Sequence, residues 1–240
     1  MVQNGKVTAF FLKIIATISM FIDHFAFASR TMLSSEVYRN LRHIGRVGFP
    51  IYCFLLVEGY KHTSSKSRYL VSLIILAVIS EYPYDTFFYS WEQRQFGMNV
   101  VVTLATGLCL IWVSETFLAA YSKRKAELLS FCAFICASLM AERVNMTYGW
   151  FGIFLIYLIY VFDKIKCVKI PKLWSAFAIM MWCILYDIDA KRLVEIYGIL
   201  SCIPIMAYYG DKGGIGINPK LEKWAFYLFY PLHLIVLKAL

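Results

Sequence analysis

Charged residues are scarce in this chain. Only 16% of its 240 residues are Asp, Glu, Lys or Arg, whereas 60% are hydrophobic. A soluble domain keeps a polar surface, so this composition and the mean hydropathy of +0.64 exclude an ordinary soluble protein. We therefore expect an all-α, multi-pass protein of the cell membrane, in contact with the lipid bilayer.

Several other features are missing. None of the seven cysteines falls in a C-x-x-C motif, and no H-E-x-x-H motif accompanies the four histidines, so we expect no metal. The net charge of +9 does not indicate nucleic acid, because the basic residues lie in loops between apolar segments. No Pro-, Gly- or Ser-rich linker divides the chain, which predicts a single domain over residues 1–240. The first apolar segment lacks a small-residue cleavage site, so we expect no cleavable signal peptide.

Nine apolar segments were identified as candidates to cross a hydrocarbon layer of about 30 Å, at about 1.5 Å per helical residue. They lie at 8–28, 44–60, 69–84, 99–120, 127–141, 148–162, 172–186, 193–209 and 224–239. With the N-terminus in the cytoplasm, 15 of the 24 Lys and Arg residues fall on the cytoplasmic side. The positive-inside rule therefore favours a cytoplasmic N-terminus.

The first segment, LKIIATISMFIDHF at 12–25, contains three ionisable side chains in an apolar run. Lys13 and His24 are 11 residues apart, which places both on one stripe of a helix, about 16 Å apart along its axis. A lone lysine can snorkel to the interface, and a lone histidine can be a packing residue. Two such residues on one stripe indicate instead a cavity or a bundle interior.

The second segment, IGRVGFPIYCFLLVEGY at 44–60, has the same character. Arg46 is expected near the depth of His24, either in a functional site or as an interfacial anchor. Asp23 points away from His24 and is expected to pair with Arg46 or with a neighbouring helix. Pro50 is expected to kink this helix.

Glu58 lies at the inner end of the second segment, near the expected depth of Lys13. It is either part of a functional site or a helix-end carboxylate paired with Lys61. Four of the remaining polar candidates lie at the ends of later segments: Glu81 (closing the third with Pro83), Asn99, Thr103 and Tyr148. Tyr230 and His233 lie within the apolar run of the last segment, beside Pro231. A general base, a cation for a developing oxyanion and such donors at one depth suit acyl or proton transfer.

Six stretches, in order along the chain, carry a resemblance to the TraX family. They are LKIIATISMFIDH, IGRVGFPIYCFLLVEGY, RYLVSLIILAVISEYPYD, NVVVTLATG, YGWFGI and FYLFYPLHL. The family is named for a protein that acetylates the N-terminal amine of F-type pilin, and it is more distantly similar to the type 3 membrane acyltransferases. In that wider group the first span carries Arg or Lys, then ten residues, then His. Lys13 and His24 match this pattern.

The resemblance implies a membrane acetyltransferase that takes acetyl-CoA from the cytoplasm and delivers the acetyl group at the outer face. The acceptor would be an amine or hydroxyl of a peptide, protein or glycan, with a peptide or protein N-terminus favoured. His24 would be the base or the acyl carrier, and Arg46, with Asp23, would stabilise the oxyanion. The donor-binding candidates are Lys13, Glu58, Lys61 and Arg68. The substrate-positioning candidates are Glu81, Asn99, Thr103, Tyr148, Tyr230 and His233.

Two other functional classes fit the same buried charges. In a small gradient-driven transporter or flippase, Asp23, Arg46 and Glu58 would form a proton or substrate path. The chain shows no internal symmetry of the kind that many transporters have. In an assembly subunit of a surface system, the buried charges would only fix the register of the helices.

Overall fold

The computed structural model describes residues 7–92, 97–164, 172–191, 193–214, 216 and 218–239. Apart from two isolated backbone bridges, every regular element in these residues is helical, which confirms the all-α prediction. The helices form two compact units, residues 1–55 with 162–240, and residues 56–161. That the chain is a single functional domain stays a prediction.

The first unit joins the two ends of the sequence. Its elements are α1 (Ala9–Ala28), α2 (Ser35–Gly45), the first half of α3 (Gly48–His62), α8 (Leu173–Ala190), the 3₁₀ helix η1 (Glu195–Ser201), α9 (Cys202–Met206) and α10 (Pro219–Lys238). α1 packs against α2 and α10, and α8 packs against η1 and α9. This unit therefore surrounds the polar first segment with helices from both ends of the chain.

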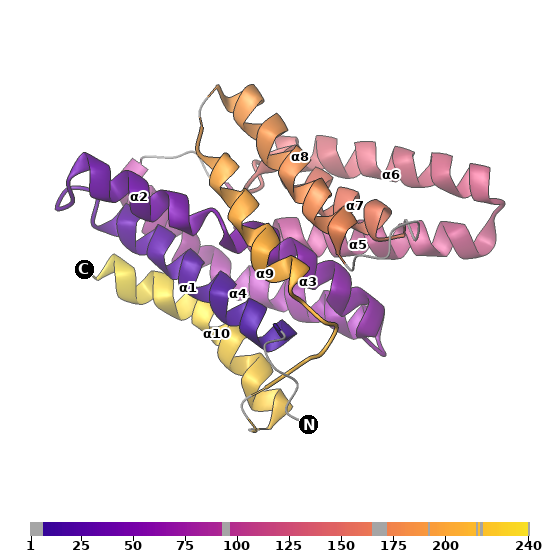
Figure 1. Ribbon diagram of the computed structural model, residues 1–240, viewed down its shortest axis with the longest axis horizontal. Coiled ribbons are helices and arrows are strands. Elements are labelled where there is room, and N and C mark those ends of the chain that lie inside the picture. Colours follow the sequence, from indigo (N-terminus) through magenta and orange to yellow (C-terminus); the bar gives the residue numbers. More distant parts are fainter. Residues whose placement is uncertain are drawn as a thin grey trace. The chain divides into compact units, whose positions relative to one another are not determined.

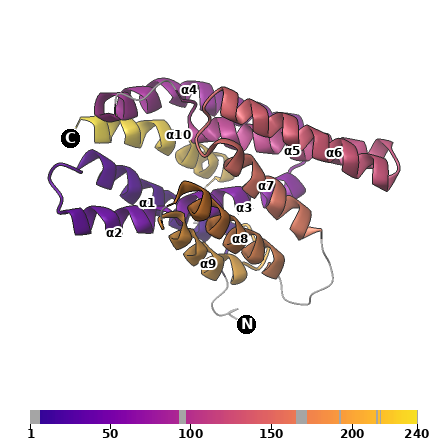
Figure 2. The same cartoon turned by 90° about the horizontal axis from the view of Figure 1, so that it is seen from above.

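α1 and α10 lie side by side and point in the same direction (Figures 1 and 2). Phe10 contacts Phe226 in the first halves of the two helices, and His24 lies beside His233 further along both. At the start of α1, the backbone N–H groups of Ala9 and Phe10 donate to the carbonyls of residues 211 and 212, just before α10. If both helices cross a bilayer, the total number of membrane-crossing segments, counted from α1 to α10 with both included, is therefore odd.

The second unit contains α4 (Lys66–Glu92), α5 (Val100–Ala120), α6 (Lys123–Arg143) and most of α7 (Gly149–Asp163). α5 packs against both α4 and α6, and Leu110, Phe134 and Ile153 share a buried cluster. A Cβ at Gly107 would overlap the side chain of Ile156, so this glycine lets α5 and α7 approach closely.

Four of the described helices are long and apolar enough to cross a membrane: Ala9–Ala28, Lys66–Phe88, Val100–Ala120 and Leu173–Ala190. Large apolar side chains such as Ile18, Ile75 and Val78 are exposed on them, as a lipid environment favours. By contrast, α3, α7 and the η1–α9 pair are each only about 22 Å long, less than the hydrocarbon thickness of about 30 Å. The count of nine spans is therefore not confirmed.

The predicted boundaries of two segments are wrong. Residues 44–60 are not one helix, because α2 ends at Gly45 and α3 begins at Gly48. Pro50 lies in the first turn of α3, where its missing N–H has no helical partner to lose, so no kink follows. α4 does not close at Pro83 but continues through it to Glu92.

The parallel arrangement of α1 and α10 predicts that Thr31, just after α1, and Lys212, just before α10, lie on opposite sides of the membrane. Both side chains are exposed. In a cysteine-free background, we expect a membrane-impermeant maleimide to label Thr31→Cys from outside and Lys212→Cys only after lysis. Lys238→Cys, at the end of α10, should label like Thr31→Cys. Labelling of positions 31 and 212 from the same side would contradict the arrangement.

Candidate functional site

Four charged side chains form a continuous ion-pair network in the first unit. The carboxylate of Asp23 on α1 accepts from Arg42 of α2 at 2.8 Å and from Arg46 at 2.7 Å. Arg46 also donates to the buried Glu195 of η1 at 2.8 Å. The predicted pairing of Asp23 with Arg46 is confirmed, and the two negative charges balance the two positive ones.

The break between α2 and α3 brings Arg46 to this network. Ser19 of α1 donates to the carbonyls of Ile44 and Gly45, at 2.6 and 3.2 Å, which fastens the end of α2 to α1. A Cβ at Gly45 would overlap the side chain of Asp23, so only glycine lets the backbone come this close. The sequence thus uses a serine and a glycine to position the arginine.

Sequence patterns did not reveal Arg42, Asp187 or Glu195. Arg42 lies between the first two apolar segments, where the sequence indicates a loop, but in the structure it is on α2 and contacts Asp23. Asp187 of α8 accepts the backbone N–H of Glu195 at 2.9 Å and that of Ile196 at 2.7 Å, capping the start of η1. The stretch between Asp187 and Glu195 also contains Asp189, Lys191 and Arg192, so its charges look like those of an ordinary loop and gave no distinct signal.

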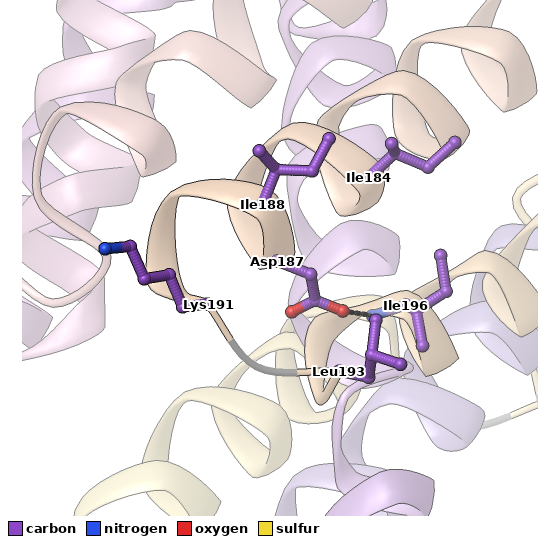
Figure 3. Close-up of a pocket in the computed structure, with 6 residues that line it drawn as sticks. All are labelled: Ile184, Asp187, Ile188, Lys191, Leu193 and Ile196. Carbon is purple, nitrogen blue, oxygen red and sulfur yellow. Dashed lines mark hydrogen bonds between the residues drawn. The ribbon is translucent and has the colours of Figure 1, made fainter.

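A pocket of about 480 Å³ lies beside this cap, lined by Ile184, Asp187, Ile188, Lys191, Leu193 and Ile196. Figure 3 shows the carboxylate of Asp187 directed at the backbone of Ile196, while Lys191 extends away from it. Because both oxygens of Asp187 accept backbone bonds, this carboxylate serves the fold of η1.

The second feature of the site is a pair of histidines from the two parallel helices. The Nδ1 atom of His24 on α1 lies 2.7 Å from the Nε2 atom of His233 on α10. The Nδ1 atom of His233 lies 2.9 Å from the carbonyl oxygen of Phe229, one turn earlier. His233 is almost fully buried, and the ring of Tyr230 packs near it. His24 follows Asp23 in the chain, so the pair adjoins the ion-pair network.

A third histidine attaches α2 to η1. The ring of His43 stacks on that of Tyr197, with ring centroids 3.8 Å apart. Burial, and then the charges of Arg39 and Arg46, lower the pKa of His43 below its ordinary value, because all three disfavour a further positive charge. The lowered pKa favours the neutral form of the ring that stacks on Tyr197.

Lys13 and His24 face the same neighbour, α10. The ammonium of Lys13 lies 5.5 Å from the centre of the Phe226 ring, and His24 bonds to His233, seven residues further along α10. The predicted common stripe is confirmed. Sequence patterns had not shown that α10 packs along it.

The other donor-binding candidates belong to the second unit. Glu58 is buried and forms an ion pair with Lys61, with His62 at 3.6 Å, so the predicted helix-end pairing is confirmed. Arg68 is exposed near the start of α4. Their role in binding a donor stays a prediction.

The outer-end candidates Glu81, Asn99, Thr103 and Tyr148 also lie in the second unit, where three of them hold the ends of α4, α5 and α7 together. The amide of Asn99 donates to the carboxylate of Glu81 and to the carbonyl of Ala77, while its oxygen caps α5. The hydroxyl of Thr103 donates to the carbonyl of Thr147 at 2.7 Å, and Tyr148 follows in a turn with a φ of 65°. These bonds give Asn99 and Thr103 a structural role; substrate positioning stays a prediction.

In the part of the chain that the structure describes, no cluster of three or more His, Cys, Asp or Glu side chains could hold a metal ion.

Comparison with known proteins decides the family. A family model described as TraX protein matches residues 9–240. The chain belongs to the TraX family. A relative from Dichelobacter nodosus, described as "Probable fimbrial assembly protein FimC, serogroup H1", is 30% identical over 259 residues. The alignment covers 99% of this chain and 97% of the relative. No solved structure matches the chain.

The TraX match contains the whole candidate site, from Lys13 to His233. The family resemblance drawn from six short stretches is thereby confirmed over nearly the full chain. The family match and the four apolar helices both indicate a membrane protein.

Removing Asp23 should destabilise the first unit, because Arg42 and Arg46 would then face each other with Glu195 as the remaining partner. Breaking a buried pair costs about 3–5 kcal/mol. Since Arg42 is 25% exposed and Asp23 13% exposed, we expect about 3 kcal/mol for Asp23→Ala. The measurement is the midpoint of thermal unfolding in detergent. Glu36→Ala, which removes an exposed carboxylate of α2, is the control, and an equal midpoint for both variants would contradict the role of the network.

Proposed function

We propose that this TraX-family protein is a membrane-embedded acetyltransferase that moves an acetyl group from cytoplasmic acetyl-CoA to an amine or hydroxyl at the outer face. The observation that supports this most is the placement of His24. It is hydrogen-bonded to a second histidine and lies next in the chain to an ion-pair network that holds two arginines. A base and a fixed positive charge in one place suit acyl transfer.

In the proposed reaction the acceptor nitrogen or oxygen attacks the thioester carbonyl carbon. A new C–N or C–O bond forms, the C–S bond breaks, and the sulfur leaves with its electron pair. His24 takes the proton that the acceptor loses and returns it to the CoA thiolate, so that protons and charges balance. The guanidinium of Arg46, which is paired with Asp23 and Glu195, is proposed to lie near the oxyanion that develops on the carbonyl oxygen.

The donor would meet residues that suit its anionic part. The phosphates of CoA attract lysine and arginine. Lys13 lies on the His24 stripe, toward the start of α1, so it would bind the donor on the cytoplasmic side. Arg68 is exposed and could contact a phosphate, whereas the charge of Lys61 is already offset by Glu58.

The acceptor we favour is the N-terminal amine of a pilus or fimbrial subunit. Two facts support this choice: the chain belongs to the TraX family, and the printed name of its Dichelobacter nodosus relative refers to fimbrial assembly.

An assembly subunit without enzymatic activity is the second candidate, because the relative is named for assembly and not for catalysis. The ion-pair network also suits it, since buried charges can fix how helices pack. The two candidates differ in what they require of His24: acetyl transfer needs its imidazole, whereas helix packing needs only its shape.

His24→Ala should therefore reduce acetyl transfer by about 10²–10⁴-fold, the usual contribution of a general base. Transfer is measured as CoA thiol released from acetyl-CoA by purified protein with an amine-bearing peptide. His62→Ala, at the end of α3, is the matched control and should stay active. Folding of each variant is checked by its thermal midpoint. A folded His24→Ala protein with full activity would remove the proposed role of His24 as the base, whereas a folded wild-type protein without peptide-dependent thiol release would remove the acetyltransferase proposal.

Lys13→Ala should weaken binding of the donor more than it slows the chemistry, because Lys13 lies about 16 Å along α1 from His24. We expect a several-fold rise in the KM for acetyl-CoA with a nearly constant kcat. Lys123→Ala, which removes an exposed lysine at the start of α6, is the control for a general loss of positive charge. A reduced kcat at an unchanged KM would exclude the donor-binding role.

A further inference from the structure

We propose that His233 is a positioning residue that fixes the tautomer of His24, so that the Nε2 atom of His24 is the nitrogen that takes the proton in the reaction. This inference rests on the proposed acetyltransferase function, but the tautomer itself can be observed without any turnover. His233 was predicted to position the substrate; in this proposal it instead contacts and orients His24, the base.

The assignment begins at a backbone carbonyl. The Nδ1 atom of His233 lies 2.9 Å from the carbonyl oxygen of Phe229. A carbonyl oxygen only accepts hydrogen bonds, so Nδ1 of His233 must carry a proton and donate it. In a neutral imidazole one nitrogen is a donor and the other an acceptor. The Nε2 atom of His233 is therefore an acceptor.

The same rule then determines His24. Its Nδ1 atom lies 2.7 Å from the accepting Nε2 atom of His233, so Nδ1 of His24 must be the donor. The neutral His24 ring consequently has its lone pair on Nε2. The proton positions follow in one direction, from Phe229 through His233 to His24.

Packing holds the relay in this geometry. The two imidazole planes are within 5° of each other, and the ring centroids are 5.0 Å apart. The ring of Phe229 lies nearly parallel to that of His233, at 7°, and His233 is only 4% exposed. A buried imidazole packed against these rings cannot easily rotate to exchange the positions of its two nitrogens.

The adjacent carboxylate is occupied elsewhere. In a Ser-His-Asp triad a carboxylate orients the histidine base. Here both oxygens of Asp23 accept from arginines, Arg42 and Arg46. The orienting role therefore falls to His233, whose neutral ring accepts the same N–H.

The relay also determines how charge is handled. When Nε2 of His24 takes a proton, its Nδ1–H still points at the lone pair of His233. The pair can then share one extra proton along this bond. Addition of a second proton would set two N–H groups against each other. We therefore expect the relay to act as a one-proton acceptor.

The first experiment is NMR of protein with ¹⁵N-labelled histidine, in detergent or nanodiscs at neutral pH. The chain has only four histidines, so single substitutions assign every signal. In water a neutral imidazole favours the tautomer with its proton on Nε2. We expect the opposite tautomer, with the proton on Nδ1, for both His24 and His233. His43 and His62 serve as internal references. A proton on Nε2 of His24 in the folded wild-type protein would overturn the proposal.

The second experiment compares two substitutions of His233. His233→Phe keeps a buried ring but removes the acceptor, and we expect His24 to lose its fixed tautomer and kcat to fall at least about tenfold. His233→Gln offers a carbonyl oxygen near the position of Nε2 and should restore both. The KM for acetyl-CoA should not change in either variant.

The outcomes separate the two levels of the argument. The Nδ1 tautomer in a protein without transferase activity would support the relay and remove the proposed function. A normal kcat in a folded His233→Phe protein would overturn the positioning role of His233 and leave the proposed acetyl transfer intact.

Discussion

A charge buried in an apolar helix bundle must meet its opposite, and this constraint arranges the first unit. Asp23 lies on α1 with two arginines against it, and Glu195 on η1 balances the second of them. An unpaired member would carry a large desolvation cost. These ion pairs therefore fix the positions of α1, α2 and η1 relative to one another. Gly45 lets the end of α2 approach Asp23 of α1. His24 inherits its position from this arrangement, because it follows Asp23 on the same helix.

The two carboxylates and the histidines of this site divide their work. Asp23 and Glu195 neutralise arginines, so their role is to hold charge and structure, whereas His24 and His233 can exchange a proton. Such a division is what acyl transfer needs, since the base must stay neutral until the acceptor attacks. Under the proposed function, modification of a fimbrial subunit would be one step of assembly, which is compatible with the name of the Dichelobacter nodosus relative.

Local patterns predicted the local features well. The period of a helix was enough to place Lys13 and His24 on one stripe, and charge in an apolar run was enough to pair Asp23 with Arg46. The interruption before Gly48 was missed because residues 44–60 look like one apolar segment. Glu195 was missed because its partner, Arg46, is distant in the sequence, and Asp187 was missed because it lies in a stretch with other charged residues that looks like a loop. Contacts between α1 and α10, more than 200 residues apart, depend on the packing of the whole unit and leave no periodic signal.

The most direct test of the account is the release of CoA thiol from acetyl-CoA by the folded wild-type protein, measured with and without a peptide that has a free N-terminal amine. The account predicts release that depends on the peptide, with one thiol for each acetylated amine found by mass spectrometry. Folded protein that neither binds acetyl-CoA nor releases thiol would contradict acetyl transfer and leave an assembly role as the better explanation.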